Sequence, residues 1–155
     1  MPKPYSQDLR DRVIDAVETL LAEAEAEAGE SDVAFCTINH ALAASERTGR
    51  HWYDVETHRI RGEILLRGKS ADTLTAEEAF QRAIAVAGEQ GARTFGLRAA
   101  LSLARLYQST GRPAEAHAVV EPALQGFSST LEMPEIAEAQ ALLVAIEADA
   151  HVRHE

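Results

Sequence analysis

The feature that most constrains this chain is a pattern of residues that occurs three times. In each copy a small residue is followed by large, Ala and large residues at offsets of 4, 7 and 8, and successive copies begin 42 and 40 residues apart. Because these offsets fall on one face of a helix, each copy predicts an amphipathic helix whose alanines allow close approach of a neighbour. The three copies are Ala34/Ile38/Ala41/Leu42, Ala76/Phe80/Ala83/Ile84 and Ala116/Val120/Ala123/Leu124. A repeat of this length predicts stacked supersecondary units.

Each copy follows another segment with apolar residues at helical spacing, so the unit is a pair of helices. Connections between the expected helices are short, which makes consecutive helices antiparallel neighbours. Pro122 lies inside the third repeated helix and is expected to kink it. We therefore predict an all-α fold over residues 1–155, with no strand. The expected helices are 7–28, 31–48, 52–67, 74–90, 94–110, 113–126 and a last one from about Pro134 to about Ala150.

This pattern resembles the tetratricopeptide repeat (TPR), a helix hairpin with small residues at its eighth and twentieth positions. In this alignment Ala104 takes the eighth position and Tyr107 the eleventh, and Gly62 takes the eighth position if the turn of the second repeat is two residues longer than usual. The first repeat departs from the motif, because Ala22 suits the eighth position but Glu25 falls where a large apolar residue is expected. The resemblance implies a right-handed superhelix of three hairpins over residues 20–126, closed by a capping helix at 134–150.

Longer strings resemble one particular group of TPR proteins. The segments HWYDVETHRIRGEILL, AEEAFQRAIAVA and LRAALSLARLYQSTGR are similar to the C-terminal tail of bacterial proteins that join an adenylate or guanylate cyclase domain to a predicted ATPase. The resemblance covers about residues 20–147 and implies a detached regulatory tail. No phosphate-binding G-x-x-x-x-G-K-[ST] motif is present, so cyclase or ATPase activity is not implied.

The first residues have a different origin in this interpretation. Residues 1–18 resemble the opening of insertion-sequence transposases, where they begin a helix-turn-helix DNA-binding domain. Only the first helix of that domain is present, and DNA reading needs the second one. We interpret the protein as a gene fusion in which this stub forms part of the first repeat's helix. Its apolar stripe makes self-association through Leu9, Val13 and Val17 an expectation, because a shortened solenoid exposes an end face.

The net charge and the cysteine content limit the kinds of partner and the cellular compartment that we expect. The net charge is −10, which disfavours nucleic acid and anionic membranes as partners. Residues 51–112 hold 9 basic and 7 acidic side chains, and are the one region with a positive balance. A single cysteine, Cys36, excludes an intrachain disulfide and is expected to be buried or half-buried. With no apolar run at the N-terminus and none long enough to span a membrane, we expect a cytoplasmic protein.

The candidate site follows from the TPR resemblance, which places the concave face on the first helix of each hairpin. The residues at the groove positions are Glu56, Arg59, Glu63, Leu66 and Arg67 in the second repeat, and Arg98, Leu101, Arg105, Gln108 and Ser109 in the third. Four arginines in one groove suit carboxylates, so the expected ligand is an acidic peptide or a partner helix. The alternative is that these charges neutralise one another in surface pairs.

The overall expectation is a non-catalytic protein-interaction module. No histidine or cysteine spacing fits zinc, and no catalytic arrangement can be recognised, so we expect no metal, cofactor or enzyme activity. Trp52, Tyr53 and His58 are expected to pack between repeats. Two alternatives stay open: a fusion relic with a stable fold and no selected function, and a DNA-binding fragment derived from a transposase.

Overall fold

The protein is described by a computed structural model that covers residues 4–128 and 133–152. Within these residues the polypeptide forms seven α-helices and no strand, which confirms the all-α prediction. The helices are α1 (Pro4–Glu27), α2 (Ser31–Thr48), α3 (Asp54–Arg67), α4 (Thr73–Gln90), α5 (Arg93–Ser109), α6 (Pro113–Leu124) and α7 (Pro134–Val152). No described helix combines the length and apolar character that crossing a membrane requires.

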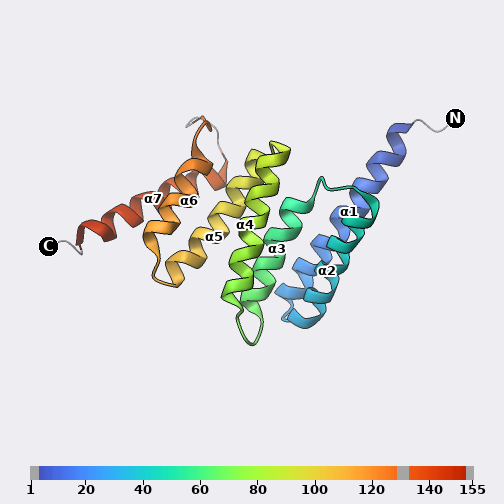
Figure 1. Ribbon diagram of the computed structural model, residues 1–155, viewed down its shortest axis with the longest axis horizontal. Helices are drawn as coiled ribbons and strands as arrows, with labels where there is room; N and C mark the ends of the chain where they lie inside the picture. The colour runs from blue at the N-terminus through green and yellow to red at the C-terminus, as the bar shows by residue number, and fades with distance from the viewer. Residues whose placement is uncertain (1–3, 129–132, 153–155) are drawn as a thin grey trace.

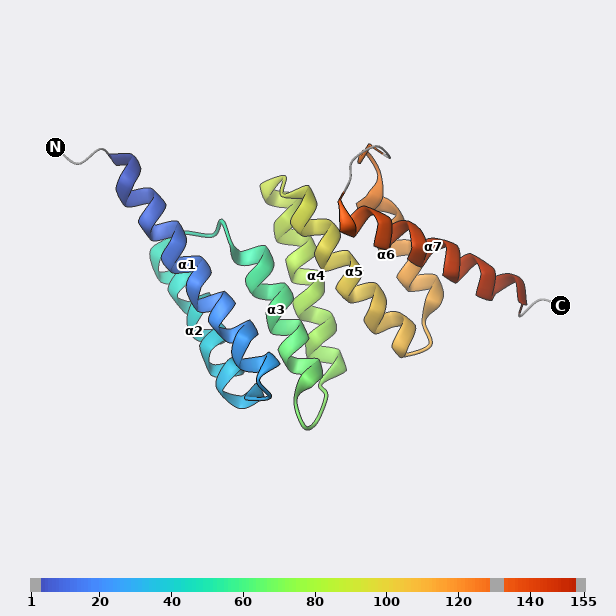
Figure 2. The same ribbon diagram turned by 180° about the vertical axis from the view of Figure 1, so that it is seen from behind.

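The helices form two layers. Each helix packs on the next one in the sequence, and each odd-numbered helix also contacts the next odd-numbered one, from α1 through α3 and α5 to α7. The odd-numbered helices therefore make one layer, and α2, α4 and α6 cover it from the other side (Figure 1; Figure 2, from behind). α1 and α7 lie at opposite ends of the stack. This order places the face of the candidate groove residues on α3 and α5.

The repeated pattern marks the packing between the layers. Its first two positions are fully covered in all three copies, as in Ala76 and Phe80 of α4. Phe80 lies directly against Gly62 of α3, where an added Cβ atom would lie 2.5 Å from Cε1 of the ring. A glycine opposite a phenylalanine thus lets two helices approach more closely than any larger residue would allow.

Helix ends follow their local chemistry. Gly91 ends α4 in the left-handed conformation, with φ of 66°, and Asp72 begins the same helix by accepting a hydrogen bond from the Thr75 amide at 3.0 Å. α6 ends at Leu124, two residues before the expected end. Pro122 lies inside this helix, which ends where Gln125 leaves helical geometry, with ψ of 132°, and Gly126 takes φ of 79°.

α1 makes polar contacts with the rest of the stack. The Thr19 and Thr57 hydroxyls lie 2.9 Å apart in the interior. Asp15 accepts two hydrogen bonds from the Arg50 guanidinium, at 2.9 and 3.0 Å, and a third from the Trp52 indole at 3.3 Å. Asp15, within the N-terminal segment 1–18, thus ties α1 to the residues that precede α3.

Two features of the first hairpin depart from expectation or from the motif. Cys36 is exposed, which corrects the prediction that it is buried or half-buried. The neighbouring Ala34 and Ile38 turn inward, and the cysteine takes the opposite face of α2. Glu25, at the position where the motif has a large apolar residue, has a buried Oε2 atom with no hydrogen-bond partner among the described residues.

Candidate functional site

The candidate site is the face that α3 and α5 present between α1 and α7. On α3 the spacing of Glu56, Arg59 and Glu63 puts three charged side chains on one face. On α5 Arg98 and Arg105, seven residues apart, face them across the helix contact. The two helices pack side by side, so the charges of both converge.

A buried ion cluster forms the centre of this face. The Arg59 guanidinium donates to the Glu56 carboxylate at 3.0 Å, and Nη1 of Arg98 lies 3.2 Å from the same carboxylate. Glu56 is only 2% exposed and Arg59 only 9%. Burial disfavours the charged guanidinium, but the hydrogen bonds to Glu56 together with the attraction of Glu56, Glu23 and Glu63 outweigh it, so the pKa of Arg59 is raised. The hydrogen bonds between the two side chains hold both of them in place.

Carboxylates from the flanking helices extend the cluster. Glu23 of α1 lies 3.6 Å from Arg59, and Glu135 of α7 lies 3.7 Å from Arg98. Glu63 lies 3.9 Å from Arg59 and accepts a hydrogen bond of 2.7 Å from the Ser102 hydroxyl. All four odd-numbered helices are thereby joined through charged groups on one face.

The margin of the face is more open. A pocket of about 220 Å³ is lined by Glu23, Ala26, Arg59, Ile60, Glu63, Ile64, Arg67 and Arg105. Arg67 is exposed and makes no ion pair within the described part of the protein. Arg105 pairs with Glu138 of α7, and both side chains are about half exposed, at 52% and 44%. The pocket thus has two accessible guanidinium groups at its edge.

The structure brings most of the expected groove residues to this face. Glu56, Arg59, Glu63, Arg67, Arg98 and Arg105 lie on it or at its pocket. Leu101 instead belongs to the buried core, Leu66 packs against that core, and the Ser109 hydroxyl bonds to the carbonyl of Leu106. Gln108 is exposed. The alternative is right that these charges pair with one another, as in Arg59–Glu56, Arg59–Glu63 and Arg98–Glu56, but wrong in placing Glu56 and Arg59 at the surface, since both are buried.

Sequence reasoning missed the carboxylates that flanking helices contribute. Glu23 directly follows Ala22, as Glu63 follows Gly62, so its repeat position already placed it on the groove face. Glu135 and Glu138 lie in the helix interpreted only as a cap, and no repeat position marked them. The groove is therefore less basic than the count of arginines suggests.

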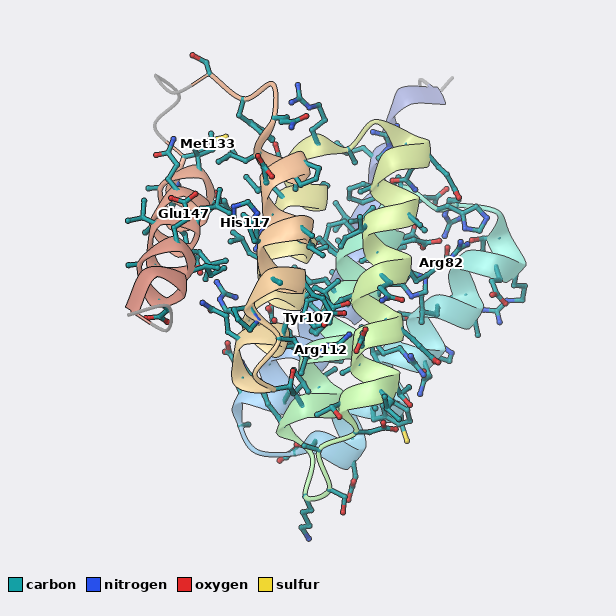
Figure 3. All side chains as sticks on the ribbon, turned by 60° about the vertical axis from the view of Figure 1, so that its left-hand side comes forward. Arg82, Tyr107, Arg112, His117, Met133 and Glu147 are labelled. Atoms are coloured by element: carbon teal, nitrogen blue, oxygen red, sulfur yellow. The ribbon has the colours of Figure 1, made fainter. Side chains whose placement is uncertain are left out.

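A second polar cluster lies at the other side of the stack, between α4 and the α5–α6 turn. Figure 3 shows Arg112 beside Tyr107, with its guanidinium carbon 4.3 Å from the ring centre. Arg112 donates to Glu77 at 2.7 Å and also bonds Glu115. The pKa of Glu77 is lowered, first by the Arg112 hydrogen bonds and then by the Tyr107 hydroxyl. These contacts join α4 of the second hairpin to α5 and the start of α6 in the third hairpin.

Comparison with known proteins identifies no relative: no family model, no curated protein and no solved structure matches this sequence. Among the residues that the structure describes, no group of three His, Cys, Asp or Glu side chains could hold a metal ion. The groove itself is therefore the feature from which a function can be inferred.

Proposed function

We propose that this protein is a non-catalytic interaction module with a TPR-like superhelical arrangement, which binds an acidic peptide or partner segment on the inner face of α1, α3, α5 and α7. Support for the arrangement comes from the two alternating layers and from the close contact of Gly62 with Phe80. The three-fold pattern of small and large residues places these contacts at equivalent positions of successive hairpins. The resemblance to cyclase- and ATPase-associated tails supports a regulatory role.

The observation that carries the proposal is the pocket beside Arg67. Its inner wall includes Arg59, which the buried Glu56 holds in place, while Arg67 and Arg105 stand at its edge. A guanidinium binds a carboxylate through two parallel hydrogen bonds, which suits an aspartate, a glutamate or the carboxylate at the end of a peptide.

The energies of the existing pairs decide which arginines meet the ligand. An exposed pair such as Arg105–Glu138 is worth about 0–1 kcal/mol, so a ligand carboxylate can replace Glu138 at small cost. Separating Arg59 from the buried Glu56 would leave an uncompensated charge and cost about 3–5 kcal/mol. Arg67 and Arg105 are therefore the ligand-contacting residues, and Arg59 and Arg98 belong to the supporting framework.

The test is peptide binding by a single charge-reversal variant and a matched control. A fluorescently labelled peptide with an acidic C-terminal sequence is titrated with wild-type protein, and anisotropy reports binding. Arg67→Glu is expected to weaken binding about tenfold or more, as expected for a lost charged hydrogen bond. Arg82→Glu makes the same charge change at an exposed position of α4 and is expected to leave binding unchanged.

Three results would contradict the proposal. Equal weakening by Arg67→Glu and Arg82→Glu would show that the affinity for the acidic peptide depends only on the overall charge of the protein. Tighter or unchanged binding by the folded Arg67→Glu variant would exclude the pocket. No binding of any acidic peptide to wild-type protein would favour a fold that has lost its ligand, as a fusion relic would.

A further inference from the structure

The N-terminal helix turns its large apolar side chains away from the rest of the protein. Val13 is 54% exposed and Leu9 58%, and four neighbouring side chains are similar. At 100° per residue these side chains occupy about 140° of the helix circumference. We call the six residues the α1 stripe: Leu9, Val13, Ile14, Val17, Leu20 and Leu21.

The inward face of α1 has the opposite character. The side that packs on α2 and α3 carries Asp15, Thr19, Ala22 and Ala26, which are polar or small. A surface helix normally places its large apolar residues against the core and its polar residues in water. α1 reverses this order, so the α1 stripe remains exposed to solvent when a single copy has folded.

The other end of the stack is built differently. α7 exposes Ala137, Gln140, Ala141 and Glu147, and Val144 is the one exposed large hydrophobic residue among its described side chains. Helical stacks end in elements with a polar outer face, because the last helix has no neighbour to cover it. The described outer face of α7 mixes alanines and Val144 with polar residues such as Gln140 and Glu147, so it lacks the row of large apolar side chains that α1 exposes.

We propose that the α1 stripe is covered by a second copy of this protein, with the two α1 helices antiparallel across a twofold axis. A head-to-tail contact would place the stripe against the outer face of α7, which has no matching row of large apolar side chains, and would generate an open filament. A twofold contact covers both stripes at once. Six half-exposed side chains offer roughly 600 Å² per copy, so the dimer would bury on the order of 1,200 Å², within the range of specific interfaces.

Charge at the two ends of the stripe supports the antiparallel orientation. Arg10 lies on the stripe face at its N-terminal end, and Glu27, eighteen residues or five helical turns after Leu9, lies on that face at its C-terminal end. An antiparallel pair brings Arg10 of each copy towards the acidic end of the other. A parallel pair would place Arg10 beside Arg10, which is unfavourable.

Two other acidic groups of α1 do not oppose the contact, because arginines of the same copy compensate them. Asp15 pairs with Arg50 and Glu23 with Arg59, while Glu18 lies 3.2 Å from the His40 ring. The stripe is therefore flanked by few uncompensated charges, in a protein with a net charge of −10.

The experiment measures mass in solution by size-exclusion chromatography with light scattering. Wild-type protein is expected at twice the monomer mass of 16.8 kDa, and Val13→Asp at the monomer mass. Val144→Asp is the matched control, since it places the same charge on an exposed valine at the other end and is expected to remain dimeric. Circular dichroism checks that each variant keeps its helicity. If Val13→Asp loses helicity, Leu20→Gln combined with Leu21→Gln takes its place.

A cross-linking measurement tests the orientation. In a Cys36→Ser background, Val17→Cys lies near the middle of the stripe and is expected to form an intermolecular disulfide under mild oxidation. Leu9→Cys is expected not to do so, because two Leu9 positions in an antiparallel pair lie about 20 Å apart at 1.5 Å per residue.

The proposal is overturned by any of four results. These are a monomeric wild-type protein at every concentration, an unchanged mass for the folded Val13→Asp variant, an open-ended assembly, and efficient cross-linking through Leu9→Cys. A monomeric wild-type protein would mean that a different molecule, or no molecule, covers the stripe.

Discussion

Replacing Gly62 by alanine tests whether close packing of α3 on α4 is what the repeat pattern encodes. The added Cβ atom would lie 2.5 Å from Cε1 of Phe80 and 2.8 Å from both Cδ1 and Cζ. Phe80 is fully buried, so its ring has no free space into which it can move. Either the ring or the helix must shift.

The expected magnitude is the balance of two opposing effects. Alanine stabilises the middle of a helix by about 0.5–1 kcal/mol relative to glycine. Overpacking of a filled core costs about 1–3 kcal/mol. We expect Gly62→Ala to lower the free energy of unfolding by about 1–2 kcal/mol, although alanine has the higher helix propensity.

A matched control separates the two effects. Gly88 lies in α4, is exposed, and has no atom within 4 Å of an added Cβ. Gly88→Ala should therefore show the propensity gain alone, about 0.5–1 kcal/mol of added stability. The difference between the two variants measures the clash with Phe80.

The assay is urea unfolding followed by far-ultraviolet circular dichroism, with the free energy extrapolated to water. Gly62→Ala combined with Phe80→Leu is the further test, since a smaller side chain at position 80 should recover part of the loss, with a coupling of about 1 kcal/mol or more. If Gly62→Ala is as stable as Gly88→Ala, the close contact between α3 and α4 is not present and the reasoning fails.

Three further predictions concern single side chains. Glu77→Gln should lower stability at neutral pH by about 1 kcal/mol, because the charged hydrogen bonds from Arg112 are lost. The pKa of Glu77 is lowered in the folded state, so the stability that its charge contributes is present above pH 4.5 and disappears as the pH falls through the folded pKa. Urea unfolding at several pH values should therefore show the stabilities of wild-type protein and Glu77→Gln converging in acid. Glu25→Leu should raise stability by about 1 kcal/mol, since it removes a buried carboxylate oxygen without a partner among the described residues, and a loss of stability in the same assay would contradict this. Cys36 should react with an aromatic disulfide reagent nearly as fast in native protein as in urea, and strong protection would show that it is not exposed.

The helices could be predicted well from the sequence because residues within and next to each helix mark its end and its buried face. The glycines after α2 and α4 take the left-handed conformation that ends a helix, and the four-position pattern marks which face is covered. These signals are local, so they can be recognised without knowing the arrangement of the whole protein. Four ends differ by two or three residues: α1 begins three residues before the expected start, α3 begins two residues after it, α6 ends two residues early and α7 ends two residues late.

The properties that the sequence did not predict depend on neighbours distant in the sequence. Repeat position alone predicts Glu56 and Arg59 as groove residues open to a ligand, but both are buried and paired with side chains of α5 and α1. Periodicity on α3 identifies a polar face, and it cannot tell a face in water from one closed over by other helices. For α1 the repeat architecture supplied what periodicity could not, because an end helix of a shortened solenoid was expected to expose Leu9, Val13 and Val17, and all three are exposed.

The groove and the α1 stripe use different faces of one helix, so the two proposals can fail separately. Glu23 points toward Arg59 at the groove, whereas the stripe is centred about 110° away around the α1 axis at 100° per residue. A dimer formed through the stripe leaves the face of α3 and α5 open. Val13→Asp should therefore abolish the dimer while the monomer still binds the acidic peptide, and Arg67→Glu should do the reverse. Loss of both properties in the folded Val13→Asp variant would mean that the groove is complete only in the dimer.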